Sequence, residues 1–117
     1  MNYLINPGMI SKHPFAQKLQ RIIEANISDE NFGVTELSAH ANLGRQQIHR
    51  KLKALTGRST SDFIHAVRVH YSKKLLRTTD LSIKEIAFRV GYRDPTDFTK
   101  KFKAEFGMTP SEWRKSL

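Results

Sequence analysis

The sequence predicts an all-α fold of about seven helices, in which two helix-turn-helix subdomains are joined by a long linker helix. Apolar residues recur three and four positions apart, which is the spacing of one helix face, and no segment alternates convincingly as a strand would. Residues 51–65 and 101–115 repeat one another fifty positions apart, as KLKALTGRSTSDFIH and KFKAEFGMTPSEWRK. An internal repeat constrains architecture, so we expect two copies of one helical unit.

The first half of the chain is expected to form an arm and three helices. Residues 1–13 show no clear period, which indicates a linker or a flexible N-terminal arm. A helix over 14–27 begins with proline at its first position. Thr35 is expected to cap a short second helix that runs through Ala41, and a third helix covers 44–56.

A long helix and three shorter ones are expected to complete the chain. Ser59 and Asp62 resemble a capping box and open the helix 59–78. The later helix starts are marked by Ser82 with Glu85, by Asp94-Pro95, and by Thr109-Pro110-Ser111-Glu112. The predicted division of the chain is an arm over 1–13, a first helix-turn-helix subdomain over 14–58, the linker helix over 59–78, and a second helix-turn-helix subdomain over 79–117.

Each subdomain has the residues that a helix-turn-helix needs. The two helices touch at a small residue, the turn requires a residue that accepts a positive φ four positions later, and the second helix supplies an apolar residue. These residues are Ser38, Asn42 and Ile48 in the first subdomain, and Ala87, Gly91 and Phe98 in the second. One such pattern is a weak signal, but two copies in register with the repeat are a strong one.

The charge of the chain indicates a nucleic-acid partner. The formal net charge is +9, which is typical of a protein that binds an anionic polymer. The chain has no cysteine, which suits a reducing cytoplasm and excludes disulfides and thiolate metal sites. Its apolar runs are too short to cross a membrane.

The second helix of each pair carries a polar stripe opposite its apolar face. The stripe is Gln46, His49, Arg50 and Lys53 in the first pair, and fifty positions later it is Thr96, Thr99, Lys100 and Lys103. Long donors on one helix face can reach base edges in the major groove. Arg50 would bond guanine and Gln46 would bond adenine.

The second half, IKEIAFRVGYRDPTDFTKKFKAEFGMTPSEWRK, resembles the C-terminal signature of the AraC/XylS family of bacterial transcription regulators. The first half fits as well, in ELSAHANLGRQQIHRKLKALTG and around Arg68, Leu75 and Leu76 in the linker helix. The resemblance covers residues from about 15 to 117. It implies sequence-specific binding of double-stranded DNA for transcription regulation, with recognition helices 44–56 and 94–106 in adjacent major-groove segments.

The stripes and the resemblance together give the expected contacts with DNA. The base-reading residues are expected to be Gln46, His49, Arg50, Thr96, Asp97, Thr99 and Lys100. The phosphate-binding residues, which set affinity and register, are expected to be Arg45, Lys51, Lys53, Arg58, Arg93, Lys101 and Lys103. Asp97 stands where the family often has an aromatic residue; we favour a helix-capping role for it over acceptance of a bond from cytosine.

Members of the family usually carry an additional sensing or dimerisation domain, for which this chain has no room. The N-terminal part is similar to output modules of hybrid two-component proteins, so we expect a monomeric fragment of a longer regulator; a free-standing small activator is the alternative. The expected partner is an asymmetric DNA site with two segments about one helical turn, roughly 34 Å, apart. RNA polymerase is a second candidate partner.

The sequence fits three other function classes less well. An enzyme is not expected, because the chain has no glycine-rich phosphate loop, and His65 and His70 do not share a helix face as a metal pair would. We therefore expect no catalytic residue, metal or cofactor. Single-stranded RNA readers use exposed aromatic residues, whereas those of this chain are expected to face inward: Phe98, Phe102, Phe106 and Trp113. The alternative function is a non-specific DNA-gripping or protein-docking module in which only the first helix-turn-helix reads bases.

Overall fold

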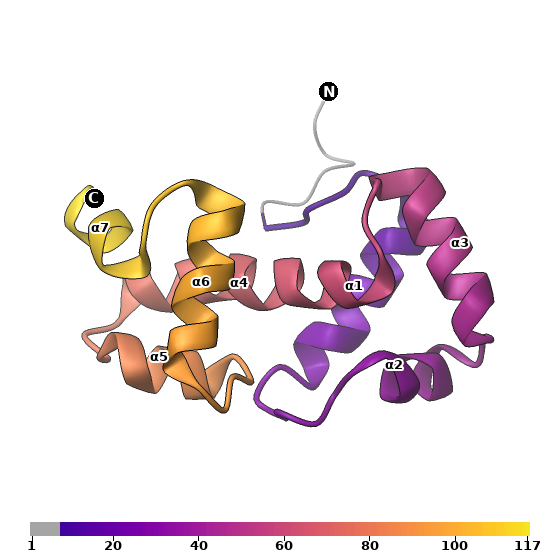
Figure 1. Ribbon diagram of the computed structural model, residues 1–117, viewed down its shortest axis with the longest axis horizontal. Coiled ribbons are helices and arrows are strands. Elements are labelled where there is room, and N and C mark those ends of the chain that lie inside the picture. Colours follow the sequence, from indigo (N-terminus) through magenta and orange to yellow (C-terminus); the bar gives the residue numbers. More distant parts are fainter. Residues whose placement is uncertain (1–7) are drawn as a thin grey trace.

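Seven helices and no strand make up the part of the chain described by the computed structural model, residues 8–117 (Figure 1). They are α1 (Pro14–Ala25), α2 (Val34–Ala41), α3 (Arg45–Thr56), α4 (Thr60–Thr78), α5 (Ile83–Arg89), α6 (Pro95–Phe106) and α7 (Pro110–Lys115). The predicted all-α fold is therefore confirmed.

The long helix α4 is the shared wall of two hydrophobic cores. Figure 1 shows α4 across the middle of the molecule, with α1–α3 toward one end and α5–α7 toward the other. Phe63 and Val67 of α4 belong to the core of the first group, while Val69 and Leu76 belong to the core of the second. We refer to the two groups as the first unit and the second unit. Each unit packs its helix-turn-helix pair against its own part of α4.

The internal repeat of the sequence is also a repeat of structure. Helices α3 and α6 begin and end fifty positions apart, and so do the starts of α4 and α7. Gly57 and Gly107 end the two second helices with φ of 75° and 80°. The pattern of buried and exposed residues over 51–62 recurs position by position over 101–112. The two recognition helices are therefore equivalent surfaces on equivalent scaffolds.

Both helix-turn-helix turns use the residues that the sequence singled out. Asn42 has φ of 55° and is the one non-glycine residue at positive φ among residues 8–117. Beside it, the hydroxyl of Ser38 donates to the carbonyl of Leu43 and fastens the turn to α2. In the second unit, Gly91 has φ of 90° and follows α5 directly after Val90. These conformations fix the angle at which each second helix leaves its turn.

Two helix boundaries differ from the sequence-based expectation by more than one residue. Helix α1 ends at Ala25, two residues before the expected Ile27. The prediction that Thr35 caps α2 was wrong, because the helix begins at Val34 and its N-cap is Gly33. The backbone N–H of Gly33 donates to Oε1 of Glu36 over 2.9 Å. This bond caps the first turn of α2 at Gly33, two residues before Thr35.

Part of the expected N-terminal arm lies against α1. Residues 1–7 lie outside the described part of the chain, so the expectation of flexibility is not tested there. Beyond them, Nε2 of Gln20 donates to the carbonyl of Gly8 over 2.8 Å, and its Oε1 accepts from the N–H of Ile10 over 3.0 Å. Gln20 is 1% exposed, and Ile10 packs on the first core. This stretch is therefore bound to the first unit rather than free.

Arg68, in the middle of α4, joins the two units. Its side chain is 4% exposed. Its guanidinium donates to the carbonyls of Ile27 and Phe32 in the loop that follows α1, each over 2.8 Å, and to that of Asp29 over 3.1 Å. The same guanidinium donates over 2.8 Å to the carbonyl of Val90, at the turn of the second unit. One buried cation thus satisfies backbone groups from both units and holds them in one orientation.

A second polar cluster joins the units at the other end of α6. Arg58, in the turn before α4, makes a bidentate ion pair with Glu105 over 2.8 and 2.9 Å. Nε2 of His70 on α4 lies 2.9 Å from Oε2 of the same carboxylate. The hydrogen bonds from Arg58 hold the pKa of Glu105 below its ordinary value, since they favour the ionised carboxylate. With Arg68, this cluster fixes the distance and angle between α3 and α6.

Candidate nucleic-acid interface

The predicted stripe of α3 lies on its exposed face. Ile48 and Leu52 are fully buried on the opposite face and hold the helix against the first core. The stripe residues, all exposed, are Gln46, His49, Arg50 and Lys53. The N-cap of α3 is Gly44, which has no side chain to bond the first turn. The helix is therefore held by its buried face and presents the whole stripe outward.

Helix α6 presents the equivalent face in the second unit. Phe98 and Phe102 are fully buried beneath it. Thr96, Lys100 and Lys103 are exposed, whereas Thr99 is half-buried. Figure 1 shows α3 and α6 crosswise to α4 and on either side of its centre. The structure thus gives both predicted stripes access to a partner, with shorter polar side chains on α6 than on α3.

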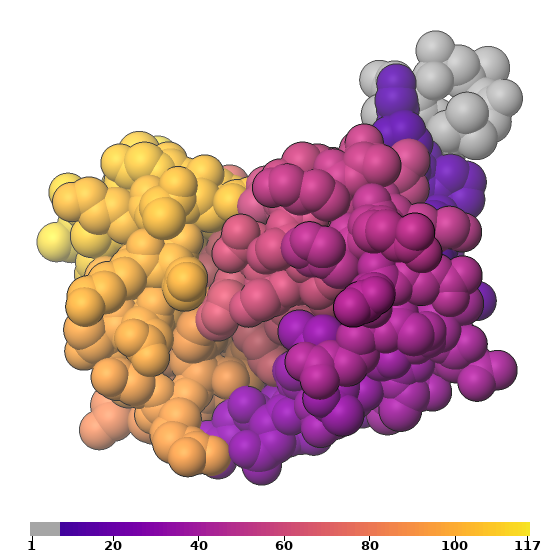
Figure 2. Space-filling view, turned by 45° about the vertical axis from the view of Figure 1, so that its right-hand side comes forward, coloured from indigo at the N-terminus to yellow at the C-terminus, as the bar shows by residue number. Residues whose placement is uncertain are grey.

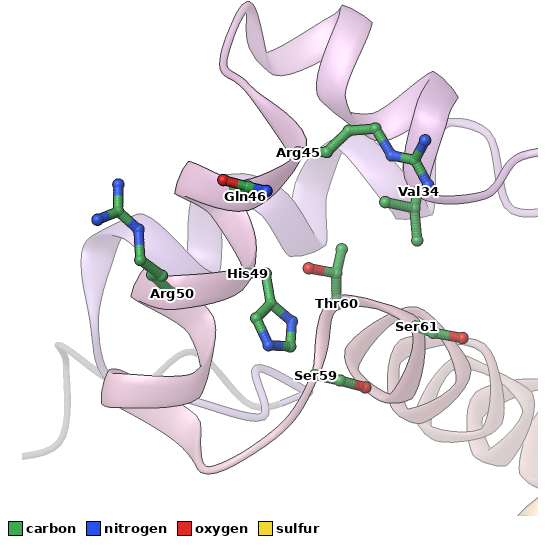
Figure 3. Close-up of a pocket in the computed structure, with 8 residues that line it drawn as sticks. All are labelled: Val34, Arg45, Gln46, His49, Arg50, Ser59, Thr60 and Ser61. Carbon is green, nitrogen blue, oxygen red and sulfur yellow. The ribbon is translucent and has the colours of Figure 1, made fainter.

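A hollow of about 740 Å³ lies between the stripe of α3 and the beginning of α4. It is lined by Val34, Arg45, Gln46, His49, Arg50, Ser59, Thr60 and Ser61 (Figure 3). Figure 3 shows the imidazole of His49 turned toward Ser59 and Thr60, whereas the guanidinium of Arg50 extends away from them. The lining includes two arginines and no carboxylate, so the hollow favours an anionic partner.

A second hollow, of about 390 Å³, continues this surface toward α6. It shares Val34 and Ser61 with the first hollow, and Arg93, Asp97 and Lys101 contribute to its second-unit side. Figure 2 shows the two units as lobes, the first in purple and magenta and the second in orange and yellow, with pink α4 residues recessed between them. The recognition helices therefore flank a concave surface that belongs to both units.

The expected phosphate-binding residues differ in how free their charges are. Arg45 and Lys101 line the two hollows, and Lys103 is exposed. Arg58 is bound to Glu105, so its charge is already matched within the protein. Arg93 donates to Glu30 over 3.0 Å but is 74% exposed, and an exposed pair of this kind contributes little.

Two lysines of α3 are also expected to bind phosphate, and both contact other parts of the first unit. The ammonium of Lys51 lies 4.8 Å from the ring centre of Phe15 on α1. Lys53 donates to the carbonyl of Gly57 over 3.2 Å and so helps to close the C-terminal end of α3. Both side chains remain exposed and keep their charge at the surface.

The favoured capping role of Asp97 is not seen. The cap of α6 is Asp94, whose carboxylate accepts from the backbone N–H of Thr96 over 2.9 Å. No hydrogen bond to the carboxylate of Asp97 occurs within residues 8–117, and this residue lines the second hollow with Lys101. The reason is one of spacing, because Asp94 directly precedes Pro95 at the first helical position and reaches the free N–H groups first.

The surface beside Asp97 is closed by a histidine–tyrosine pair. Nδ1 of His65 lies 2.7 Å from the hydroxyl of Tyr92, and the two rings stack at 5.6 Å. Burial lowers the pKa of His65, with a further contribution from the charge of Lys101. Burial also raises the pKa of Tyr92. Both groups therefore favour the neutral form, and they form part of the wall between the units.

The aromatic residues do not form a base-stacking platform. Phe98 and Phe102 are fully buried, as expected. Phe106 and Trp113 were expected to face inward and are only partly buried; the ammonium of Lys73 lies 3.6 Å above the ring of Phe106. Phe88 on α5 is 45% exposed, which the sequence did not predict. Continuous exposed aromatic surface, which readers of single-stranded RNA use, does not occur around these residues.

No group of three or more potential metal ligands occurs within residues 8–117. None of the helices in that range is long and apolar enough to span a membrane. His65 and His70 contact Tyr92 and Glu105 respectively, not each other.

Three important residues were missed or given no role by sequence reasoning. Arg68 was noted only as part of the linker-helix pattern, and nothing local signals carbonyl partners so distant along the chain. Glu105 could have been found as an isolated acid in the basic segment that follows Lys100. Thr60 was given no role beyond its place at the start of a predicted helix, and its burial is apparent only in three dimensions.

The fold and the exposed stripes define a DNA-binding domain of the double helix-turn-helix class. A family model described as a helix-turn-helix domain matches residues 37–116. The DNA-binding domain of AdpA, a global transcriptional factor solved in complex with a target DNA, superimposes with a TM-score of 0.74 at 29% identity, over 88% of this chain and 91% of that one.

Two known proteins are similar to most of this chain. Histidine kinase P4 of Formosa agariphila is 32% identical over 98 residues, which are 84% of this chain and 7% of that protein. The transcriptional activator NphR of a Rhodococcus species is 30% identical over 98 residues, which are 84% of this chain and 29% of that protein. The matched part thus spans less than a third of either relative.

The chain belongs to the AraC/XylS family of helix-turn-helix transcription regulators. The function of this domain is sequence-specific binding of double-stranded DNA in transcription regulation. The family and the fold are those of DNA-binding regulators, which are not enzymes.

Proposed function

We propose that the chain is a DNA-binding output module that places both α3 and α6 in the major groove of one asymmetric site. The two helices would enter adjacent segments about one helical turn, roughly 34 Å, apart on the same face of the duplex. The observation that carries this proposal is the recurrence of the polar stripe fifty positions apart on two helices, exposed except at half-buried Thr99. Arg68 and the Arg58–Glu105 pair hold the two helices in one arrangement. The molecule is 39 Å in its longest dimension, which is long enough for that separation.

Residue roles follow from side-chain length and exposure. Gln46, His49 and Arg50 read bases from α3, and Thr96, Asp97, Thr99 and Lys100 are the candidates on α6. Phosphates are bound by Arg45, Lys51, Lys53, Arg93, Lys101 and Lys103. We leave Arg58 out of this set, because Glu105 already neutralises it. The proposed boundaries of the two subdomains are 14–58 and 79–117, with 59–78 as the linker helix.

The setting of the module follows from its relatives. We propose that it is the output part of a longer two-component regulator, acts in the bacterial cytoplasm where the chromosome lies, and binds DNA as a monomer. Sensing or dimerisation would belong to other parts of such a protein. RNA polymerase is the second proposed partner, and no catalytic step is proposed for any residue.

The test is selection of binding sites from a random duplex library by the purified chain at near-physiological salt. Two short motifs one helical turn apart would support reading by both α3 and α6. Absence of any enriched sequence, despite salt-sensitive binding, would contradict sequence-specific reading by this chain. The control is the same selection with the stripe of α3 removed by Gln46→Ala and Arg50→Ala, which should lose the first motif and keep the second.

A second candidate function has a specific observation in its favour. The stripe of α6 offers two threonines, one of them half-buried, where α3 offers Gln46 and His49. Threonines reach less far into a groove than glutamine or histidine do. If α6 only grips the backbone while α3 reads bases, the same selection will return a single short motif.

A further inference from the structure

The hydroxyl of Thr60 is buried without a partner. Thr60 is the first residue of α4 and is 3% exposed, and its Oγ1 makes no hydrogen bond within residues 8–117. A buried hydroxyl is normally bonded, so an unbonded one in a folded protein calls for an explanation. Thr60 lines the 740 Å³ hollow beside α3, and Figure 3 shows its oxygen on the side of Gln46 and His49. The hydroxyl is therefore a potential donor that has no acceptor among the described residues.

The backbone at the same place also offers free donors. The hydroxyl of Ser59 accepts from the N–H of Asp62, and the carbonyl of Ser59 accepts from the N–H of Phe63. The N–H groups of Thr60 and Ser61 have no acceptor among the described residues. These are the first donors of a 19-residue helix, whose dipole favours an anion at this end.

The charges around the hollow favour a negatively charged ligand. Arg45 and Arg50 contribute to its lining, and no carboxylate does. The nearest acid of α4, Asp62, lines a different hollow, together with Arg58 and Lys101. The carboxylate of Glu36, at the start of α2, is bonded to the N–H of Gly33. An anion here therefore meets free donors and positive charge.

We propose that the N-terminus of α4 seats one phosphate of the DNA backbone, bonded by the Thr60 hydroxyl and by the N–H groups of Thr60 and Ser61. This inference rests on the proposed function, because a duplex read by Gln46 and Arg50 of α3 brings its groove edge to the same hollow. The seat explains the unbonded hydroxyl as a donor reserved for a ligand, and it fixes the register of α3 on the duplex.

The repeat makes this seat unique to the first unit. The residue fifty positions after Thr60 is Pro110, which begins α7 and is also buried. Proline has neither a hydroxyl nor a backbone N–H, and α7 is only six residues long. The seat therefore anchors one end of the domain and gives the complex a polarity that the paired stripes alone do not supply.

The test uses the duplex obtained by selection and the variant Thr60→Val, which keeps the shape of the side chain and removes its hydroxyl. A hydrogen bond to a charged group is lost, so the variant should bind about tenfold more weakly. Its thermal stability should not fall, since the hydroxyl has no partner in the free protein. Thr60→Ser restores the donor and should bind as the unmodified chain does. Thr78→Val is the matched control, because Thr78 lies at the other end of α4 and bonds the carbonyl of Lys74.

The contacted phosphate is located with duplexes that each carry one uncharged methylphosphonate. The unmodified chain should lose affinity at the seated phosphate, and Thr60→Val should lose much less at that position than at the other contacted phosphates. Equal losses by both proteins at every position would overturn the proposal, as would unchanged affinity of Thr60→Val. If the unmodified chain binds no duplex, the proposed function itself fails; if it binds and Thr60→Val binds equally well, only the seat fails.

A free anion is distinguished from a backbone phosphate by NMR. The amide signals of Thr60 and Ser61 should shift when the selected duplex is added. Inorganic phosphate at the same concentration should leave them in place, because a single ion lacks the additional contacts of the duplex. Equal shifts with inorganic phosphate would make this a site for a free anion and would overturn the proposal.

Discussion

A β-carbon on Gly91 would lie 1.7 Å from Nη1 of Arg68 and 2.6 Å from the carbonyl oxygen of Ile27. The turn of the second unit therefore comes so close to the guanidinium that joins both units that no side chain fits between them. Gly91 also has φ of 90°, which other residues rarely adopt. Position 91 therefore requires glycine for two reasons: its positive φ, and the lack of space for a β-carbon where the two units meet.

Gly91→Ala should lower the free energy of unfolding by about 3 kcal/mol or more, because strain at positive φ adds to displacement of a buried arginine. The measurement is urea denaturation followed by circular dichroism. Gly107→Ala is the matched control, because its φ is 80° but a β-carbon there meets nothing within 4 Å. It should cost about 1–2 kcal/mol from strain alone. Equal losses in the two variants would show that contact with Arg68 is unimportant.

Arg50→Ala should weaken binding to the selected duplex by about 1–3 kcal/mol and relax the preference at one base pair. The exposed guanidinium extends from the middle of α3 and is free to bond guanine bidentately. The check is to measure affinities for duplexes changed one base pair at a time. A uniform loss on all duplexes would instead make Arg50 a phosphate contact.

Lys101→Ala should weaken binding equally on all sequences and reduce the slope of log affinity against log salt by roughly one. Lys101 is exposed and lines the hollow between the units. Arg58→Ala removes the same charge from a residue that is paired with Glu105, so the slope should stay close to that of the unmodified chain. Salt titrations of both variants decide this, and a larger slope change for Arg58→Ala would reverse the assignment.

Acidification should destabilise the domain through His70. Burial lowers the pKa of His70 below its ordinary value of 6.5, although Glu105 opposes this effect. The unfolded chain then binds more protons than the folded one, so this contribution is complete above about pH 6.5 and is lost as the pH falls through the lowered pKa. The pKa of Glu105 is also lowered, but that contribution disappears at more acidic pH.

His70→Gln should therefore flatten the decline of unfolding free energy between about pH 7 and pH 5, by at most about 1.4 kcal/mol per pH unit. Some decline should remain, because burial also lowers the pKa of His65. Denaturant unfolding at a series of pH values provides the measurement. A slope identical to that of the unmodified chain would mean that His70 does not contribute to the acid sensitivity.

The local parts of the fold could be predicted from the sequence, because the interactions that define them span only a few residues. Ser82 and Glu85 form the expected reciprocal capping box, with the backbone N–H of Glu85 donating to the serine hydroxyl over 3.1 Å. Asn42 takes the expected left-handed conformation. The cap of α2 was missed because Glu36 bonds the backbone of Gly33, a glycine that carries no capping side chain to signal it.

The features of the candidate site that depend on helical spacing, namely the two polar stripes, could be predicted from the sequence. Spacing alone placed both stripes on faces that are exposed, apart from half-buried Thr99. Whether a charge on such a face is free depends on contacts between distant segments, and Arg58 and Glu105 are 47 positions apart. Thr60 could not be predicted for the same reason, because an unbonded buried hydroxyl can be recognised only when the packing around it is known.

The division of α4 between two cores also gives the chain an order of assembly during synthesis. The first core uses no buried residue beyond Val67, so it can close as soon as that part of the chain has left the ribosome. The second core needs Phe102 and packs against Trp113, near the far end of the described chain. Val69 and Leu76 then lie on a helix whose first half is already packed in the first core. The second unit therefore folds against a helix that is already in place.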